Sequence, residues 1–279
     1  MAVSLSSIKI YDTLGGFRDF AYLCAKIGRS MNDKKKRIAV FCVTFNSDKE
    51  LEQYQASLER AVKRAEDKVM IDIFVAQNTN EDNPGYFGGI KRQMDKVDLT
   101  AYDYCILSNV DLTVEDDFFD KLAAYDCAKD TGWIAPQIWS KLEGRDRNPG
   151  RVRRPSLRRV RLLRMLYRYP KLEKLYSRTL YRRKKYQAHE AGPIYAGHGS
   201  CIILTRKYME ACGKIDYPIF LFCEEIYLAE MCRQAGLNVE YVPDIRVNDI
   251  EHVSIGKMAR KAYCQYNYEA LNYIIQRFY

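Results

Sequence analysis

The chain has 279 residues, 47% of them hydrophobic and 29% charged, a composition that suits one large soluble domain or two small ones. No run of about 18 apolar residues occurs, which argues against a transmembrane helix, and the first residues lack the basic and apolar stretches of a secretory signal. Nine cysteines without paired spacing argue against a disulfide framework or a zinc site and favour a reduced, cytoplasmic protein, while the net charge of +9 points to an anionic partner.

The first predicted elements alternate between strand and helix. Residues 1–36 are expected to form a helical extension, with an amphipathic helix near 17–27. The apolar run at 37–46 predicts a strand buried on both faces, and apolar residues at helical spacing over 48–67 predict a helix. A second apolar run at 69–78 predicts another buried strand, and the turn-rich stretch TNEDNPGYFGG follows it.

The rest of the chain continues this alternation on both sides of a basic segment. The same criteria predict strands at 104–107, 133–138, 201–204 and 238–243, and helices at 115–129, directly after 204, at 224–236 and at 257–279. Short connections between alternating strands and helices are typical of an α/β domain with a mainly parallel sheet. Such sheets bind their ligands at the carboxyl ends of the strands.

Amide and carboxylate side chains gather at these predicted strand ends. Asn46 ends the first strand, Gln77 and Asn78 end the second, and Asn109 and Asp111 follow the third. Asn and Asp are also common at strand ends and helix caps, so the stretch YCILSNVDL alone has two interpretations. Its place at the binding edge of the sheet favours a metal site for a phosphorylated ligand.

Six stretches follow one another in an order that resembles family 2 glycosyltransferases. They are FCVTFN, NPGYFGG, YCILSNVDL, GHGSCIILTRKYMEACGKID, FLFCEEIYLAEMCRQAG and VEYVPDIRVNDIEHVS. Each is weak alone, but together they span 37–254 and are most similar to bacterial rhamnosyltransferase-like members that build surface polysaccharides. The resemblance implies a GT-A fold, in which helices flank a Rossmann-like mixed, mainly parallel sheet. It also implies a nucleotide-sugar donor, Mn²⁺ or Mg²⁺, and inversion at the anomeric carbon.

The resemblance also divides the chain into three parts. Residues 1–36 would be an N-terminal helical extension, and residues 37–256 the glycosyltransferase domain. That domain would carry a basic helical insertion at 141–187. Residues 257–279 would form a C-terminal amphipathic helix.

The metal motif and the late histidine of the family fall on single residues of this chain. Asp111 keeps the second carboxylate of the D-x-D motif and is assigned to the metal. Asn109 replaces the first acid and can still hydrogen-bond ribose or phosphate. His252, in IEHVS, matches the histidine that contacts the metal or the diphosphate. A hard divalent cation suits this place because it neutralises the charge that develops on a diphosphate leaving group.

The acidic pair of CEEIYL carries the expected acid–base chemistry. By resemblance Glu225 is the general base that takes the acceptor hydroxyl proton, and Glu224 beside it positions the acceptor. Two glutamates at the start of a helix are also favoured by the helix dipole alone. Sequence does not decide which of the two is the base.

The donor side of the predicted site lies on the first two strands and the glycine-rich stretch. Thr44 and Asn46 match the strand end that contacts base and ribose. Gln77, with Asn78 beside it, stands where the family has a pyrimidine-reading aspartate, so the donor stays open between UDP- and dTDP-linked sugars. Three glycines of NPGYFGG would allow the backbone to approach the donor closely, although they also suit a plain turn: Gly85, Gly88 and Gly89.

One segment supplies all of the net positive charge. Residues 141–185 contain 18 Lys or Arg and three acids, a local balance of +15 that leaves −6 for the remainder. Within 151–186, apolar residues such as Leu163 and Leu166 recur at helical spacing between arginines. A helix of this kind suits an anionic membrane surface, although nucleic acid or plain solvent are the alternatives.

These features predict a cytoplasmic enzyme attached peripherally to the inner face of the cytoplasmic membrane. It would transfer a sugar such as rhamnose from a UDP- or dTDP-linked donor to a hydroxyl of a lipid-linked saccharide, in bacterial surface polysaccharide (O-antigen) synthesis. The segment 151–186 would bind the anionic membrane, and nucleic acid is not the expected partner. Two alternatives remain: a nucleic-acid-binding protein built on 141–185, and an inactive glycosyltransferase-like fold, indicated by Asn109 and Gln77.

Overall fold

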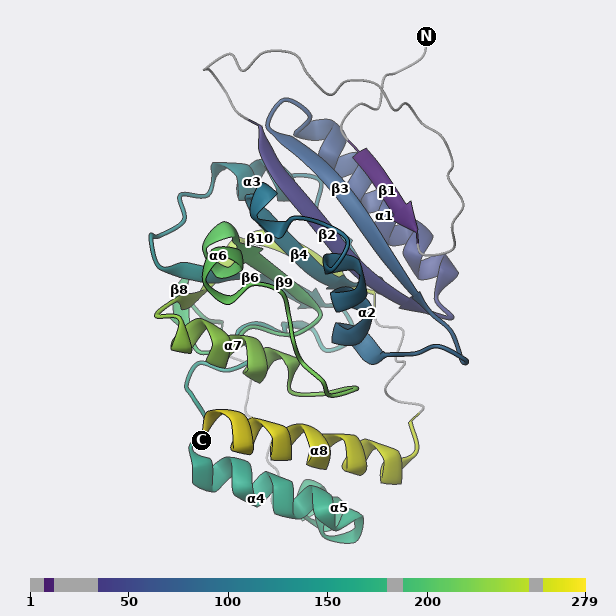
Figure 1. Ribbon diagram of the computed structural model, residues 1–279, viewed down its shortest axis with the longest axis vertical. Helices are drawn as coiled ribbons and strands as arrows, with labels where there is room; N and C mark the ends of the chain where they lie inside the picture. The colour runs from purple at the N-terminus through teal and green to yellow at the C-terminus, as the bar shows by residue number, and fades with distance from the viewer. Residues whose placement is uncertain (1–7, 13–34, 180–187, 251–257) are drawn as a thin grey trace.

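A computed structural model describes residues 8–12, 35–179, 188–250 and 258–279 (Figure 1). Ten strands form one sheet: β1 (Ile8–Asp12), β2 (Lys36–Phe45), β3 (Val69–Asn78), β4 (Tyr104–Asn109), β5 (Leu112–Val114), β6 (Thr131–Ser140), β7 (Arg145–Asp146), β8 (Gly192–Ile194), β9 (Cys201–Thr205) and β10 (Asn238–Asp249). The described helices are α1 (Asp48–Arg64), α2 (Gly85–Met94), α3 (Phe118–Ala124), α4 (Leu157–Arg168), α5 (Pro170–Thr179), α6 (Arg206–Cys212), α7 (Glu224–Gln234) and α8 (Arg260–Phe278), with a short 3-10 turn at Leu99–Ala101.

The sheet is mixed, in the order β1-β3-β2-β4-β9-β6-β10-β5. Its first four strands are parallel, so β2, β3 and β4 all end at the same edge. β9 then runs antiparallel between β4 and β6, while β10 is parallel to β6 and antiparallel to β5. The sheet therefore has a parallel half and a half of mixed direction.

Alternate side chains of the strands face two separate cores. On β2, Ile38 and Val40 belong to the core under α1 and α3, whereas Ala39 and Phe41 belong to the core under α2, α6 and α7. All four side chains are fully buried. This two-sided burial explains why the strand reads as a continuous apolar run.

A third layer of helices lies beyond α7 (Figure 1). α8 packs between α7 and the pair α4–α5 at one end of the molecule. Val160 and Leu166 of α4 are buried in this layer, and Arg164 donates to Asn272 of α8 over 3.1 Å. Arg260 of α8 forms an ion pair with the buried Glu173 of α5. Within the basic segment, α4 and α5 thus form a helical hairpin docked on the C-terminal helix, whereas β7, near the start of the segment, belongs to the sheet.

Two parts of the fold differ from what the sequence predicts. Residues 8–12 form a strand that pairs with β3, within the part expected to be helical, and the helix expected near 17–27 lies outside the described residues. The glycine-rich stretch, read as a turn, is the first turn and a half of α2. No described helix has the length and apolar character needed to cross a membrane.

Candidate active site

The ends of β2, β3 and β4 bring three predicted residues side by side. Thr44 pairs in register with Gln77, and the residue before Thr44 pairs with Asn109. Thr44 is buried, and its hydroxyl has no hydrogen-bond partner among the described residues. Asn46 follows the end of β2, is exposed, and has a left-handed backbone with φ of 53°. This edge of the sheet therefore offers an unpaired hydroxyl next to an amide.

Asn78 faces the protein rather than the open edge. Its amide nitrogen donates to Asn83 Oδ1 over 3.0 Å and to the carbonyl of Gly85 over 3.2 Å. Asn83 Oδ1 also accepts from the Gly85 amide over 3.0 Å. Asn78, predicted to bind the donor, is thus placed as the residue that holds the start of α2 against β3.

The three predicted glycines lie where α2 approaches other parts of the backbone closely. Gly85 has a φ of 82°, and a Cβ there would lie 2.1 Å from the carbonyl oxygen of Phe220. A Cβ on Gly89 would lie 3.1 Å from Val43, and one on Gly88 would lie 2.8 Å from the Pro84 ring. The glycines let α2 sit tightly on β2 and on the loop that precedes α7. The sequence predicts that these glycines let the backbone approach the donor; the contacts described here are between α2 and other parts of the protein.

Asp111 lies between β4 and β5, next to the end of β10. Its carbonyl accepts a hydrogen bond from the Ile250 amide over 3.0 Å. Burial, and then the charge of Asp249, raises the pKa of Asp111 to about 6, although Arg147 and Asn109 act in the opposite direction. Asp249 is itself buried and pairs with Arg147 over 2.5 Å.

A complete metal site is not formed by the described residues alone. Among them, no group of three or more His, Cys, Asp or Glu side chains could hold a metal ion. The acids that lie near one another at this edge are Asp111 and Asp249. His252, predicted as a second metal or diphosphate contact, lies outside the described residues, two positions after Ile250.

The acidic pair is placed at the start of α7 by a tight turn. Phe222 and Cys223 have left-handed backbones, with φ of 75° and 64°, an uncommon conformation for residues other than glycine. The Phe222 amide donates to Glu224 Oε1 over 3.0 Å. Burial, followed by the charge of Glu225, raises the pKa of Glu224 to about 8. Glu224 is therefore protonated at neutral pH.

The charges of both acidic groups act on Tyr86 of α2, a residue that the sequence did not single out. Its hydroxyl is buried without a hydrogen-bond partner among the described residues. Burial raises its pKa well above the ordinary value, and the charges of Cys201, Glu224 and Asp111 act in the same direction. Asp111 and Glu224 thus both influence one buried hydroxyl. In the sequence, the one feature that could have pointed to Tyr86 is its place, as an aromatic residue with a polar end, between the glycines of NPGYFGG.

A half-buried histidine, His198, is linked through Ser200 to the end of β4. His198 Nδ1 lies 2.9 Å from the Ser200 hydroxyl, and the Ser200 carbonyl accepts from the Asn109 amide over 2.9 Å. Burial, and then the charge of Arg147, lowers the pKa of His198 to about 4, so the ring is neutral. His198 holds the strand end in place.

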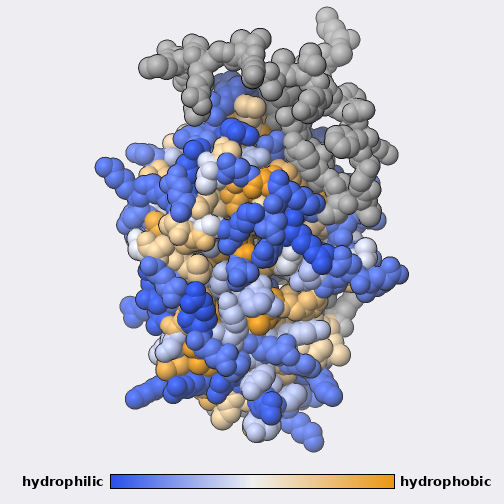
Figure 2. Space-filling model, in the orientation of Figure 1, coloured by the Kyte–Doolittle hydropathy of each residue, from blue (hydrophilic) through white to orange (hydrophobic). Residues whose placement is uncertain are grey.

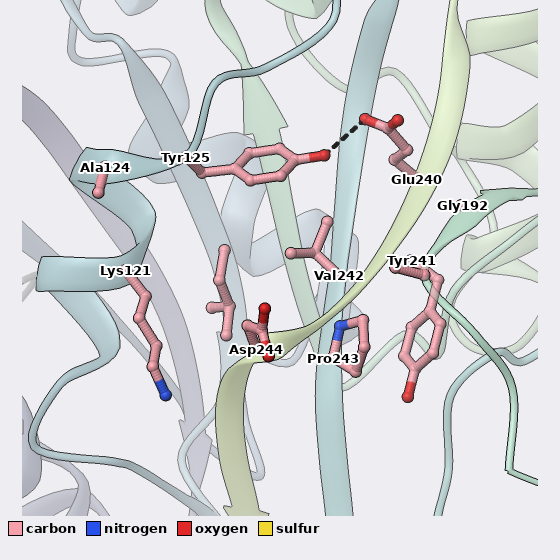
Figure 3. Close-up of a pocket in the computed structure, with 11 residues that line it drawn as sticks. Lys121, Ala124, Tyr125, Gly192, Glu240, Tyr241, Val242, Pro243 and Asp244 are labelled. Atoms are coloured by element: carbon pink, nitrogen blue, oxygen red, sulfur yellow. Dashed lines mark hydrogen bonds between the residues drawn. The ribbon is translucent and has the colours of Figure 1, made fainter.

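A pocket of the protein lies away from these residues. It encloses about 510 Å³ between the end of α3, β8 and the first half of β10 (Figure 3). Tyr125 donates to Glu240 Oε2 over 2.9 Å on one wall. None of the predicted site residues lines this pocket. The candidate active site is the edge described above.

The sequence matches no protein-family model and no curated protein. Among solved structures, GalNAc-T7 with UDP, GalNAc and Mn²⁺ is similar at a TM-score of 0.50, with 15% identity over 79% of this chain and 44% of that chain. The chain has the GT-A fold. The catalytic domain of Drosophila β1,4-galactosyltransferase 7 with xylobiose is 14% identical over 82% of this chain and 79% of that chain, with a TM-score of 0.48. Mannosyltransferase PcManGT from Pyrobaculum calidifontis, with GDP-Man and Mn²⁺, is 11% identical over 82% of this chain and 60% of that chain, with a TM-score of 0.49.

The fold class predicted from the sequence is therefore confirmed. At these identities the likeness concerns the fold, and this chain spans less than half of the GalNAc-T7 chain. Among the predicted residues, Glu224 and Asp111 both act on the pKa of Tyr86, and Asn78 donates hydrogen bonds to Asn83 and to the Gly85 carbonyl. The roles assigned to single residues stay predictions.

Proposed function

We propose that the chain is an inverting, metal-dependent glycosyltransferase of family 2. It transfers a sugar such as rhamnose from a UDP- or dTDP-linked donor to a hydroxyl of a lipid-linked saccharide, in bacterial surface polysaccharide synthesis. The observation that carries this proposal is the surroundings of Tyr86: its hydroxyl is buried without a hydrogen-bond partner among the described residues, and the charges of Glu224 and Asp111 both raise its pKa. Glycosyl transfer needs a group that stabilises the leaving diphosphate and a group that activates the acceptor, within reach of one sugar.

The donor side of this proposal rests on β2, β3 and the fold. Thr44 and Gln77 are cross-strand neighbours, and the Thr44 hydroxyl is buried without a described partner. A hydroxyl and an amide can both donate and accept hydrogen bonds, which suits the edge of a pyrimidine or a ribose. GalNAc-T7, which shares the fold, was solved with a uridine nucleotide and Mn²⁺, and this supports the same class of donor here.

The metal side rests on the charge at the end of β4. Asp111 is half-buried beside a second acid, a combination that raises its pKa and that a divalent cation would relieve. Its carboxylate oxygen suits Mn²⁺ or Mg²⁺, with further ligands from the diphosphate and, by prediction, His252. When bound, the cation neutralises the charge that develops on the leaving diphosphate. Asn109 remains beside it as a hydrogen-bond donor to phosphate or ribose.

The acceptor side rests on the different surroundings of the two glutamates. Glu224 carries a proton at neutral pH, because its pKa is raised to about 8, so it can donate a hydrogen bond but cannot take a second proton. We therefore assign the proton acceptor to Glu225 and the positioning of the acceptor sugar to Glu224. This assignment keeps the register predicted from the sequence and gives it a physical reason.

A thermal-shift screen of nucleotide sugars with and without Mn²⁺ tests the function. A bound donor at 100 times its dissociation constant adds about 2.7 kcal/mol to the free energy of unfolding, which is easily measured. Glu225→Gln should then lower turnover by on the order of 10²-fold while the donor shift persists. Glu224→Gln is the matched variant. If it is inactive while Glu225→Gln turns over normally, the two roles are reversed. Absence of any nucleotide-sugar shift would contradict the proposal, and a shift without turnover would favour the inactive fold.

A further inference from the structure

The α4–α5 hairpin has an inner face that belongs to the fold. Val160 and Leu166 are buried, and Leu163 and Tyr167 pack against the core shared with α7 and α8. Arg164 bonds to Asn272 of α8. Leu163 and Leu166, two of the apolar residues in the predicted membrane-binding segment, therefore face the protein. The apolar pattern read from the sequence mostly describes this inner face.

The outer face of the hairpin carries a second apolar row. Five of the ten exposed large hydrophobic residues in the described ranges fall here: Leu162 (40% exposed), Met165 (48%), Tyr169 (55%), Leu172 (47%) and Leu175 (59%). They are confined to a stretch of 14 residues: two lie on α4, two on α5, and Tyr169 lies between the two helices. Clusters of exposed apolar residues on a soluble domain mark sites that contact another partner. We call these five residues the outer row.

Seven of the eight basic side chains on these two helices are exposed, as the outer row is, whereas Arg164 bonds to α8. α4 and α5 together carry eight basic residues: Arg158, Arg159, Arg161, Arg164, Arg168, Lys171, Lys174 and Arg178. Glu173 is the one acid on these helices, and it is buried and paired with Arg260. Figure 2 shows hydrophilic and hydrophobic residues side by side at this end of the molecule.

We infer that the outer face of the α4–α5 hairpin binds the surface of an anionic lipid bilayer. Arginines and lysines would lie among the anionic headgroups, and the outer row would enter the boundary with the acyl chains. A nucleic acid would use the basic residues but would leave exposed leucine and methionine side chains in water. The surface is formed by the hairpin alone, so the inference does not depend on the proposed transfer reaction.

This surface also fits the proposed acceptor. The hairpin packs on α8, and α8 packs on α7, whose first residues are the acidic pair. A protein held by the hairpin would keep its acceptor site close to the plane in which a lipid-linked saccharide moves. Attachment would place the protein peripherally at the inner face of the cytoplasmic membrane, as the sequence predicts.

Sedimentation of the full chain with vesicles tests the inference. The vesicles contain about one third phosphatidylserine and two thirds phosphatidylcholine in about 0.15 M salt. Arg158→Gln with Arg161→Gln should weaken binding about 30-fold, since each basic residue near such a surface contributes about fivefold. The matched control is Lys49→Gln with Lys63→Gln, two exposed lysines of α1, which should bind as the unaltered protein does.

A second pair of variants separates lipid from other anions. Met165→Gln with Leu172→Gln should weaken vesicle binding about tenfold, because apolar contacts with the acyl boundary are lost. Met70→Gln with Leu142→Gln, also exposed, is the control. Unchanged sedimentation of both hairpin variants would overturn the inference. Failure of the unaltered protein to bind vesicles would also overturn it. A third contrary result would be that the protein binds RNA more tightly than vesicles and that Met165→Gln with Leu172→Gln leaves this RNA binding unchanged.

Discussion

Replacing Glu224 by glutamine should make the protein more stable at alkaline pH and leave it unchanged at acidic pH. The pKa of Glu224 is raised from 4.5 to about 8, by burial first and by Glu225 second. Between these two values the folded protein binds a proton that the unfolded chain has released. The free energy of unfolding therefore falls as the pH rises through this range. Glutamine is neutral throughout, and it keeps an oxygen that can accept from the Phe222 amide.

The size of the effect follows from the shift. A difference of about 3.5 pH units corresponds to at most about 5 kcal/mol at about 1.4 kcal/mol per unit. The residue as a whole is only half-buried, so we expect about half of this value, roughly 2 kcal/mol. For a chain of this size that is a rise of roughly 4 °C in the unfolding temperature at pH 9.

The assay is thermal and urea unfolding of the unaltered protein and the variant from pH 4.5 to 9. Glu59→Gln, an exposed change on α1, is the control and should stay within about 0.5 kcal/mol of the unaltered protein at every pH. Two parallel stability curves for Glu224→Gln and the unaltered protein would refute the buried, protonated state. The assignment of the proton acceptor to Glu225 would then lose its physical basis.

Three further variants test other parts of the site. Asp111→Asn should abolish Mn²⁺-dependent turnover and the Mn²⁺-induced thermal shift while the fold is kept, and normal turnover at limiting Mn²⁺ would exclude it as a ligand. Tyr86→Phe should raise the free energy of unfolding in urea by about 1 kcal/mol, because it removes a buried hydroxyl without a described partner. The same variant should have a lower turnover. A loss of stability would instead show that the hydroxyl is hydrogen-bonded. Gly85→Ala should lower the free energy of unfolding by at least about 2 kcal/mol, since its Cβ would meet the Phe220 carbonyl. Gly213 has a similar φ but open space around it, so the control Gly213→Ala should lower it by about 1 kcal/mol. Equal losses would show that the contact with Phe220 relaxes.

Most elements could be predicted because both faces of the central strands are buried. Ile38 and Ala39 point to opposite cores, so β2 reads as an unbroken apolar run in the sequence. The start of α2 could not be predicted, because glycine and proline at 84–89 signal a turn and a tightly packed helix start equally well. The insertion of β9 between β4 and β6 depends on pairing between segments distant in sequence.

Some residues of the candidate site could likewise be predicted from the sequence, and others could not. Thr44 and Asp111 could be placed at the binding edge because parallel strands end together. Tyr86 could not be identified from the sequence, because a buried hydroxyl without a partner among the described residues is visible only in the packed structure. Leu162 and Leu163 are neighbours in sequence, yet one is exposed and the other faces the core, and only docking on α8 decides between them.

The docking of α4–α5 on α8 fixes the order in which this protein can be assembled on the ribosome. The hairpin ends at Thr179, and its partner helix begins at Arg260, roughly 80 residues later. At about 5–20 residues per second, the hairpin waits roughly 4 to 16 seconds after its own synthesis for the surface that covers its inner face. Tyr279 follows later still: its hydroxyl donates to the Pro155 carbonyl, and its ring centre lies 4.0 Å from the Arg154 guanidinium. During that interval the nascent chain carries two apolar faces on one short hairpin, so early capture by a chaperone or by the membrane itself would protect it from aggregation.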